Sequence, residues 1–138
     1  MKTCKMIVLL FFVWCCLATT GSAAEIYRLR MFFGLSLPGG GAVSLNEWQQ
    51  FEQKEIATTF EGFNVVDSKG YYKGQVERSK LVTVILEEKE MVKAKALAKL
   101  YATRFQQDSV MIIKTPVMEW SFIEPDTQEE GRKAVTER

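Results

Sequence analysis

The sequence predicts an α+β fold, a ferredoxin-like βαββαβ sandwich in which two helices cover one face of a four-stranded antiparallel sheet. Residues 80–86 form a nearly continuous run of β-branched and aliphatic side chains, which is typical of a strand buried on both faces. Strand and helix patterns follow one another in the order β-α-β-β-α-β. Right-handed crossovers then place the first and third strands in the centre and the second and fourth at the edges.

The first 24 residues have the pattern of a secretory signal peptide. Lys2 and Lys5 precede an apolar stretch at residues 6–18, and the small residues 22–24 follow it. The apolar stretch is shorter than the roughly 20 residues that a membrane-spanning helix requires. We therefore expect cleavage after Ala24, a periplasmic or secreted protein, and no membrane attachment after cleavage; an uncleaved anchor is the alternative.

Residues 25–123 are expected to form the ferredoxin-like domain. A domain of about 100 residues can bury a self-sufficient core without disulfides or metals. Residues 124–138 are polar and contain no aromatic side chain, which predicts a disordered tail.

The first strand is predicted over residues 26–35, where apolar side chains recur at every second position. The other side of this strand carries Arg28, Arg30 and Phe32 between Ile26 and Gly34. The apolar side consists of Tyr27, Leu29, Met31, Phe33 and Leu35.

The first helix is predicted to begin at Ser44. Glu47 lies three residues later and completes a capping box, while Val43 and Trp48 are spaced for a hydrophobic staple. Trp48 and Phe51 are expected to be core residues and not ligand contacts, because large aromatic residues are usually buried. Leu45 and Ile56 are expected on the same apolar face.

Residues 60–67 predict the second strand, ended by residues 68–70. Residues 71–78 are polar and aromatic, and they are interpreted as a long connection that leads back into the central strand as an antiparallel hairpin.

The second helix is predicted over residues 87–106, since acidic side chains gather at its start and cationic ones near its end. Residues 110–123 predict the last strand. Pro116 cannot donate to a sheet ladder, so this strand is expected at an edge or with a bulge near the proline.

This architecture leaves one sheet face without helices. Its predicted contributors are Phe32, alternate residues of 81–86, and residues 110–123, which are too apolar to face water over a large area. A homodimer formed through this face is the expected cover. The alternative is that the tail or the connection at 71–78 folds over it.

The composition excludes several kinds of chemistry. The chain has no histidine, and its three cysteines, Cys4, Cys15 and Cys16, all lie in the predicted signal segment. Histidine or thiol catalysis and His-rich or Cys-rich metal sites are therefore not expected in the domain, and neither a cofactor nor a metal is predicted. With 18 cationic and 17 anionic residues, the chain also lacks the excess of positive charge typical of nucleic-acid binding.

The candidate ligand or interface residues are Arg28, Arg30 and Phe32. The two arginines share the helix-free side of the first strand, where guanidinium groups could hold a carboxylate or phosphate. The alternatives are an ion pair with Glu119 or with a neighbouring strand, or a place at the rim of a dimer contact. The glycines at 39–41 are interpreted as a flexible connection and not as a phosphate cradle, because no Gly-Lys-Ser/Thr follows.

Several short motifs occur in a specific order between residues 28 and 121. They are Phe-Phe-Gly-Leu-Ser at 32–36, Gly-Gly-Ala-Val-Ser at 40–44, Glu-Trp at 47–48, Phe51, Phe-Glu-Gly-Phe-Asn-Val-Val-Asp at 60–67, Gly70, Glu-Arg-Ser-Lys at 77–80 and Arg-Phe-Gln-Gln-Asp-Ser-Val at 104–110. In this order the chain resembles the bacterial domain of unknown function 3574 family. The resemblance implies a small exported protein with no established activity, and hence no catalytic residues to assign. Tyr71 stands where the family usually has Trp, and no lipid-attachment site is present.

Together these patterns predict an exported, non-enzymatic module that binds a small ligand or a protein through the helix-free sheet face. The alternative from another class is a dimeric α+β barrel-type enzyme acting on an anionic small molecule held by Arg28 or Arg30. A purely structural homodimer is the third possibility.

Overall fold

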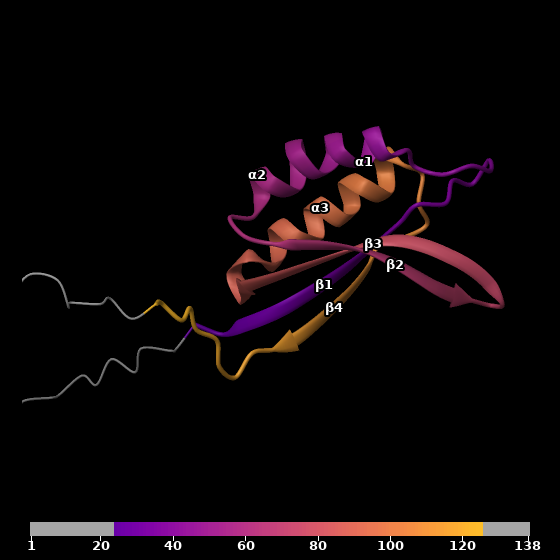
Figure 1. Ribbon diagram of the computed structural model, residues 1–138. Coiled ribbons are helices and arrows are strands. Elements are labelled where there is room, and N and C mark those ends of the chain that lie inside the picture. The colour runs from indigo at the N-terminus through magenta and orange to yellow at the C-terminus, as the bar shows by residue number, and fades with distance from the viewer. Residues whose placement is uncertain (1–23, 126–138) are drawn as a thin grey trace, which may run out of the picture.

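The computed structural model describes residues 24–125, which form a four-stranded antiparallel sheet with two helices on one face (Figure 1). The strand order is β2-β3-β1-β4, and each neighbouring pair is antiparallel, so the predicted ferredoxin-like topology is confirmed. The predicted signal segment, apart from Ala24, and the predicted tail beyond Pro125 lie outside the described residues. The elements are β1 (Ile26–Gly34), α1 (Leu45–Phe51), a π-helical turn (Glu52–Ile56), α2 (Ala57–Thr59), β2 (Asn64–Tyr72), β3 (Gln75–Glu87), a 3-10 turn (Glu88–Glu90), α3 (Met91–Arg104) and β4 (Met111–Pro116).

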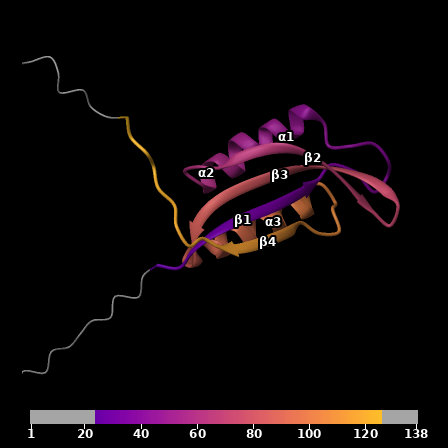
Figure 2. The same ribbon diagram turned by 60° about the horizontal axis from the view of Figure 1, so that its bottom comes forward.

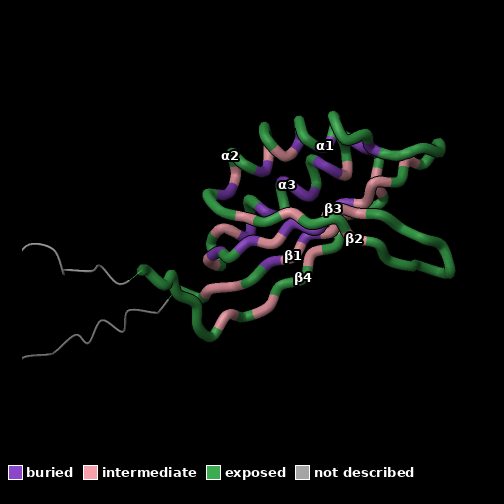
Figure 3. The backbone as a smooth tube through the Cα atoms, viewed as in Figure 1, coloured by how far each residue is buried: buried purple, intermediate pink, exposed green. Residues whose placement is uncertain are grey.

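The core lies between the sheet and the helices, on the face that alternate residues of β1 supply. Leu29, Met31 and Phe33 are fully buried there, whereas the residues between them are only half-buried or exposed. Figure 3 shows the same alternation of buried and less buried positions along β1 and β3. Period-two alternation puts successive side chains on opposite faces, so one strand serves the core and the opposite surface at once.

An aromatic cluster joins the helices to the centre of the sheet. The Tyr101 ring lies 4.8 Å from Phe33, 5.0 Å from Phe51 and 4.7 Å from Phe105, measured between ring centroids. The Tyr101 hydroxyl donates a hydrogen bond of 2.8 Å to the carbonyl of Gly34. Burial raises the pKa of Tyr101. Trp48 and Phe51 are buried in the same cluster, which confirms that they are core residues.

The first helix begins as predicted. The Ser44 side chain accepts from the Glu47 amide, and the Glu47 carboxylate accepts from the Ser44 amide, so both halves of the capping box are present. These bonds satisfy amides that the first helical turn leaves free. Leu45, expected on the buried face, is instead 65% exposed at the first position of α1.

The hairpin between β2 and β3 corrects one expectation. The long connection predicted at 71–78 is wrong, because β2 continues to Tyr72 and β3 begins at Gln75. Only Lys73 and Gly74 join the strands, and both have positive φ angles, of 48° and 79°. Two residues with positive φ form a turn whose twist matches that of an antiparallel hairpin. The antiparallel pairing of these strands is confirmed.

Three other boundaries also differ from the prediction. Strand β2 begins at Asn64 and not at residue 60, and α3 begins at Met91 after a 3-10 turn. The last strand ends at Pro116 instead of continuing to residue 123. Its position at the sheet edge is confirmed. Pro116 pairs with Tyr27, one residue from the start of β1, so the chain beyond it has almost no partner strand left.

No helix within residues 24–125 is long and apolar enough to cross a membrane.

Candidate functional site on the helix-free face

The helix-free face is built from the residues of β1 that alternate with the core. The strand register places Arg28 opposite Ile85 and Thr115, and Arg30 opposite Thr83 and Ile113. Phe32 faces Leu81 on β3 and Met111 on β4, and Val66 on β2 extends this row. Residues directly opposite one another in an antiparallel pair share a face. The structure therefore brings the three predicted site residues, Arg28, Arg30 and Phe32, onto one surface.

This surface leaves several large apolar side chains uncovered. Val66 is 53% exposed and Met111 is 54% exposed, on either side of the half-buried Phe32. Ile85 and Ile113 are also exposed, while Leu81 is covered by its neighbours in the sheet. These exposed side chains are neighbours in the sheet register, so they form a row and are not scattered singly. We call this surface, with Arg28 and Arg30, the helix-free face.

The two arginines supply the charge of this face. The Arg30 guanidinium lies 5.4 Å from the centroid of the Phe32 ring, which places the cation over the aromatic face. Neither Arg28 nor Arg30 forms an ion pair with any residue between 24 and 125, Glu119 included. The register also puts no carboxylate on this face between the row of Arg28 and the row of Gly34. The face thus combines apolar contact area with two cations that have no anionic partner in the described part of the chain.

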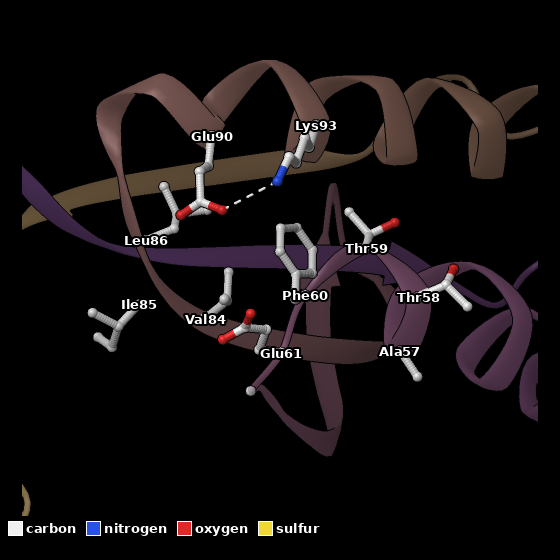
Figure 4. Close-up of a pocket in the computed structure, with 11 residues that line it drawn as sticks. Ala57, Thr58, Thr59, Phe60, Glu61, Val84, Ile85, Leu86, Glu90 and Lys93 are labelled. Atoms are coloured by element: carbon white, nitrogen blue, oxygen red, sulfur yellow. Dashed lines mark hydrogen bonds and ion pairs between the residues drawn. The ribbon is translucent and has the colours of Figure 1, made fainter.

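A first hollow, of about 380 Å³, lies between the end of α2 and the start of α3 (Figure 4). Phe60 and Val84 form part of its wall, and Glu90 and Lys93 point into it. The Lys93 ammonium is 3.3 Å from the Glu90 carboxylate, so these two charges neutralise each other. Glu61 also lines the hollow and forms no ion pair with any residue between 24 and 125.

A second hollow, of about 460 Å³, lies between α1 and the β2–β3 hairpin. The Lys80 ammonium is 2.6 Å from the Asp67 carboxylate and 6.0 Å from the centroid of the Trp48 ring. Lys69 and Arg78 face each other across the hairpin and also line this hollow. Neither of these two hollows is lined by Arg28, Arg30 or Phe32.

The chain beyond β4 is a feature that the sequence prediction missed. Residues 117–123, which we call the arm, were predicted to continue the last strand, but only Val117 remains bonded to the sheet, through its amide to the Ile26 carbonyl at 3.0 Å. Met118 and Phe122 are almost fully exposed, and Trp120 is half-exposed. The signal that could have identified the arm was Pro116, since a strand seldom continues through a proline.

The titratable groups with shifted pKa values lie away from the helix-free face. The pKa of Tyr27 is raised, chiefly because its hydroxyl donates to Glu25, and that of Lys114 is raised by its hydrogen bond to Glu88. Both side chains lie near the end of the sheet where β1 begins, with the Lys114 ammonium over the Tyr27 ring. Within residues 24–125, no group of three or more acidic residues could hold a metal ion.

Comparison with known proteins gives a fold and a family. No curated protein matches the chain. A solved structure of a phage SAM lyase in complex with S-methyl-5'-thioadenosine is similar, with 20% sequence identity, a TM-score of 0.53, and coverage of 68% of this chain and 83% of the lyase. The apo state of a phage SAM lyase is 19% identical, with a TM-score of 0.47 and coverage of 65% and 79%. At 20% identity the likeness to the first of these structures shows a common fold alone.

The family assignment comes from sequence. The profile of the family described as proteins of unknown function, DUF3574, matches residues 28–122, which is most of the described chain. The matched segment runs from the first arginine of the helix-free face to the aromatic end of the arm. It agrees with the resemblance that the ordered motifs suggested. This chain belongs to the DUF3574 family of proteins of unknown function.

Proposed function

We propose that this chain is a non-enzymatic docking module that binds an extended, apolar and acidic protein segment on its helix-free face. The observation that carries the proposal is the pairing of an uncovered apolar row, Val66, Phe32 and Met111, with the unpartnered cations Arg28 and Arg30. The apolar row supplies contact area that water would otherwise cover. The arginines favour a partner that carries carboxylates, and they select against a cationic one.

The shape of the face favours a protein segment over a small molecule. Small-ligand sites are concave and enclose most of the ligand surface, whereas Arg28, Arg30 and Phe32 line neither of the two hollows. An extended segment can lie along a flat sheet and place alternate side chains against it. A protein partner therefore fits this face better than a metabolite does.

Two synthetic peptides test this proposal. One alternates Phe with Glu and the other alternates Phe with Lys, so the two share apolar content and differ in charge. We expect the acidic peptide to bind the full chain. The Arg28→Gln/Arg30→Gln substitutions should raise the dissociation constant of this peptide at least about tenfold, measured by fluorescence anisotropy. The matched control is Lys95→Gln/Lys99→Gln, which removes the same two positive charges at exposed positions of α3. Equal binding of both peptides, or unaltered binding by the arginine variant, would contradict the proposal.

We place the module in the periplasm or outside the cell. The support is the cationic start, short apolar stretch and small residues in the first 24 positions. N-terminal sequencing of protein recovered from the cell envelope and the medium tests this placement. A chain that begins at Glu25 in either fraction agrees with export, and an intact chain confined to the cytoplasm contradicts it.

A second candidate function is that of a dimeric α+β barrel-type enzyme acting on an anionic small molecule. The observation that favours it is the fold shared with a SAM lyase solved with S-methyl-5'-thioadenosine. In this candidate two helix-free faces enclose the substrate and Arg28 or Arg30 holds its anionic group. Calorimetric titration with S-methyl-5'-thioadenosine, and incubation with SAM followed by chromatography, test it. Binding or turnover that Arg28→Ala or Arg30→Ala abolishes would favour the enzyme; neither binding nor turnover would remove it.

A further inference from the structure

The arm, residues 117–123, contains four large hydrophobic side chains that are exposed: Met118, Trp120, Phe122 and Ile123. Met118 is 94% exposed, Phe122 is 85% exposed and Ile123 is 89% exposed. Trp120 contacts Phe122 edge to face at 5.4 Å, and this pair is the one aromatic contact the structure gives the arm. Exposing several large apolar side chains to water is unfavourable in free energy. Burial of the arm against another surface would therefore be favourable.

The arm has the residue pattern of a strand that lacks a sheet. Met118, Trp120 and Phe122 occupy every second position, which places them on one side when the backbone is extended. The family profile runs through residue 122, so the arm belongs to the domain that the family shares. Because the arm is part of the domain, we look for the surface that covers it on the same domain, either in the same chain or in a second copy.

The helix-free face complements the arm in charge as well as in polarity. The arm and the two residues after it contain Glu119 and Glu124 and no cation. The face carries Arg28 and Arg30 and has no carboxylate between the row of Arg28 and the row of Gly34. Three apolar arm side chains thus match the apolar row of the face, and Glu124, on the same side of an extended arm, brings an anion toward its cations.

The direction of the arm favours the face of another copy over its own. The arm leaves the sheet at the end where β1 begins and runs away from the helix-free face in both views (Figures 1 and 2). To reach its own face it would have to reverse direction directly after Val117, which is still bonded to Ile26. Seven extended residues reach roughly 20 Å, enough to cross most of a four-stranded sheet.

We infer that two copies of this chain exchange arms, so that residues 118–123 of each copy lie on the helix-free face of the other. A twofold axis makes the two contacts identical and covers both faces at once. This inference rests on the proposed docking function and names the segment that occupies the helix-free face. The arm is the acidic, apolar segment, and the second copy is the partner.

Photo-cross-linking tests where the arm lies. Phe122 is replaced by a benzophenone-bearing phenylalanine in the full chain, and equal amounts of ¹⁴N-labelled and ¹⁵N-labelled protein are mixed before irradiation. We expect cross-links from residue 122 to peptides that contain Val66 or Met111, with one heavy and one light partner in about half of them. Cross-links confined to a single copy, or located on the helical side, would overturn the inference.

Sedimentation velocity tests what the arm contributes. Aromatic side chains at the centre of an interface carry much of its affinity, so Trp120→Ser/Phe122→Ser should weaken dimerisation at least about 30-fold. The matched control is Val92→Ser, which alters another exposed apolar side chain, on α3 and away from the sheet. A wild-type chain that stays monomeric, or equal dimerisation of all three proteins, would also overturn the inference.

A synthetic peptide of residues 117–125 separates this inference from the docking function. If it binds the chain and Arg28→Gln/Arg30→Gln weakens that binding while the wild type remains monomeric, the face docks segments but a second copy is not the occupant. If neither this peptide nor the Phe/Glu peptide binds, both proposals fail.

Discussion

The two faces of the sheet differ in what covers them, although the same strands build both. On β1, Leu29, Met31 and Phe33 are fully buried beneath the helices, whereas the alternating residues Arg28 and Phe32 belong to the helix-free face. Both faces carry large apolar side chains, but only one has a layer packed on it. The comparison teaches that the packing that stabilises the fold is concentrated on the covered face, while the other face keeps apolar side chains exposed.

The largest expected effect is on the covered face. Phe33→Ala removes a fully buried ring from the aromatic cluster and leaves a cavity against Tyr101. We expect the free energy of unfolding to fall by about 3–5 kcal/mol, measured by urea denaturation. A loss as small as that of a surface substitution would show that the cluster does not hold the helices on the sheet.

The hydroxyl of Tyr101 should matter next. Tyr101→Phe keeps the ring but removes the 2.8 Å hydrogen bond to the Gly34 carbonyl, which then has no donor from α3. We expect a loss of about 1–3 kcal/mol in the free energy of unfolding. The ring-preserving substitution is its own control for packing, so an unchanged stability would assign the role of Tyr101 to packing alone.

The cap of α1 tests how firmly the helical layer is closed. Ser44→Ala removes the side-chain acceptor for the Glu47 amide, and we expect a loss of about 1 kcal/mol. Ser44→Thr is the matched control, since threonine keeps a hydroxyl that can accept from the Glu47 amide and donate to the Glu47 carboxylate. Equal losses in the two variants would mean that the capping hydrogen bond is not what stabilises this helix start.

The helix-free face should respond to substitution in binding more than in stability. Phe32→Ser should lower the free energy of unfolding of the dissociated chain by less than about 1 kcal/mol, because the side chain is only half-buried. The same variant should lose most of its affinity for the acidic peptide. A stability loss as large as that of Phe33→Ala, its neighbour on the opposite face, would erase the difference between the faces.

The smallest effect concerns pH. The hydrogen bonds from Ser44 lower the pKa of Glu47 below its ordinary value of 4.5. A carboxyl with a lowered folded pKa contributes stability at pH values above its unfolded pKa, and this contribution is lost as the pH falls through the folded pKa. Denaturation at pH 7 and at about pH 3 should therefore show a smaller acid-induced loss for Glu47→Gln than for the wild type. Identical losses would contradict the lowered pKa.

The fold was predictable wherever a pattern was local and one-sided. The alternation in β1 and the Ser44–Glu47 box each require only a few neighbouring residues, and both are present as predicted. The antiparallel pairing of β2 with β3 was predicted, but the shortness of the turn was missed because residues 69–78 are exposed on both sides and show no hydrophobic alternation. Its Lys73–Gly74 turn is not one of the common Asn-Gly or Asp-Gly signals.

The candidate site was predictable only in part. The placement of Arg28, Arg30 and Phe32 on one face follows from the period of a strand. The arm could not be separated from β4 by composition, because large apolar side chains recur on both sides of Pro116, and the end of the strand depends on where β1 begins. Whether Arg28 or Arg30 pairs with an anion such as Glu119 depends on the strand register and on the length of the side chains. The sequence pattern alone specifies neither.

The pairing of β4 with β1 also constrains the order in which the chain can assemble. The β2–β3 ladder joins neighbours through two residues, and it can form as soon as both strands have been synthesised. The β1–β4 ladder joins the first and last strands of the domain, so it waits for nearly the whole chain. Until then β1 has an open edge that can pair with other chains. A nascent or shortened polypeptide that stops before Met111 is therefore the form of this protein most exposed to aggregation.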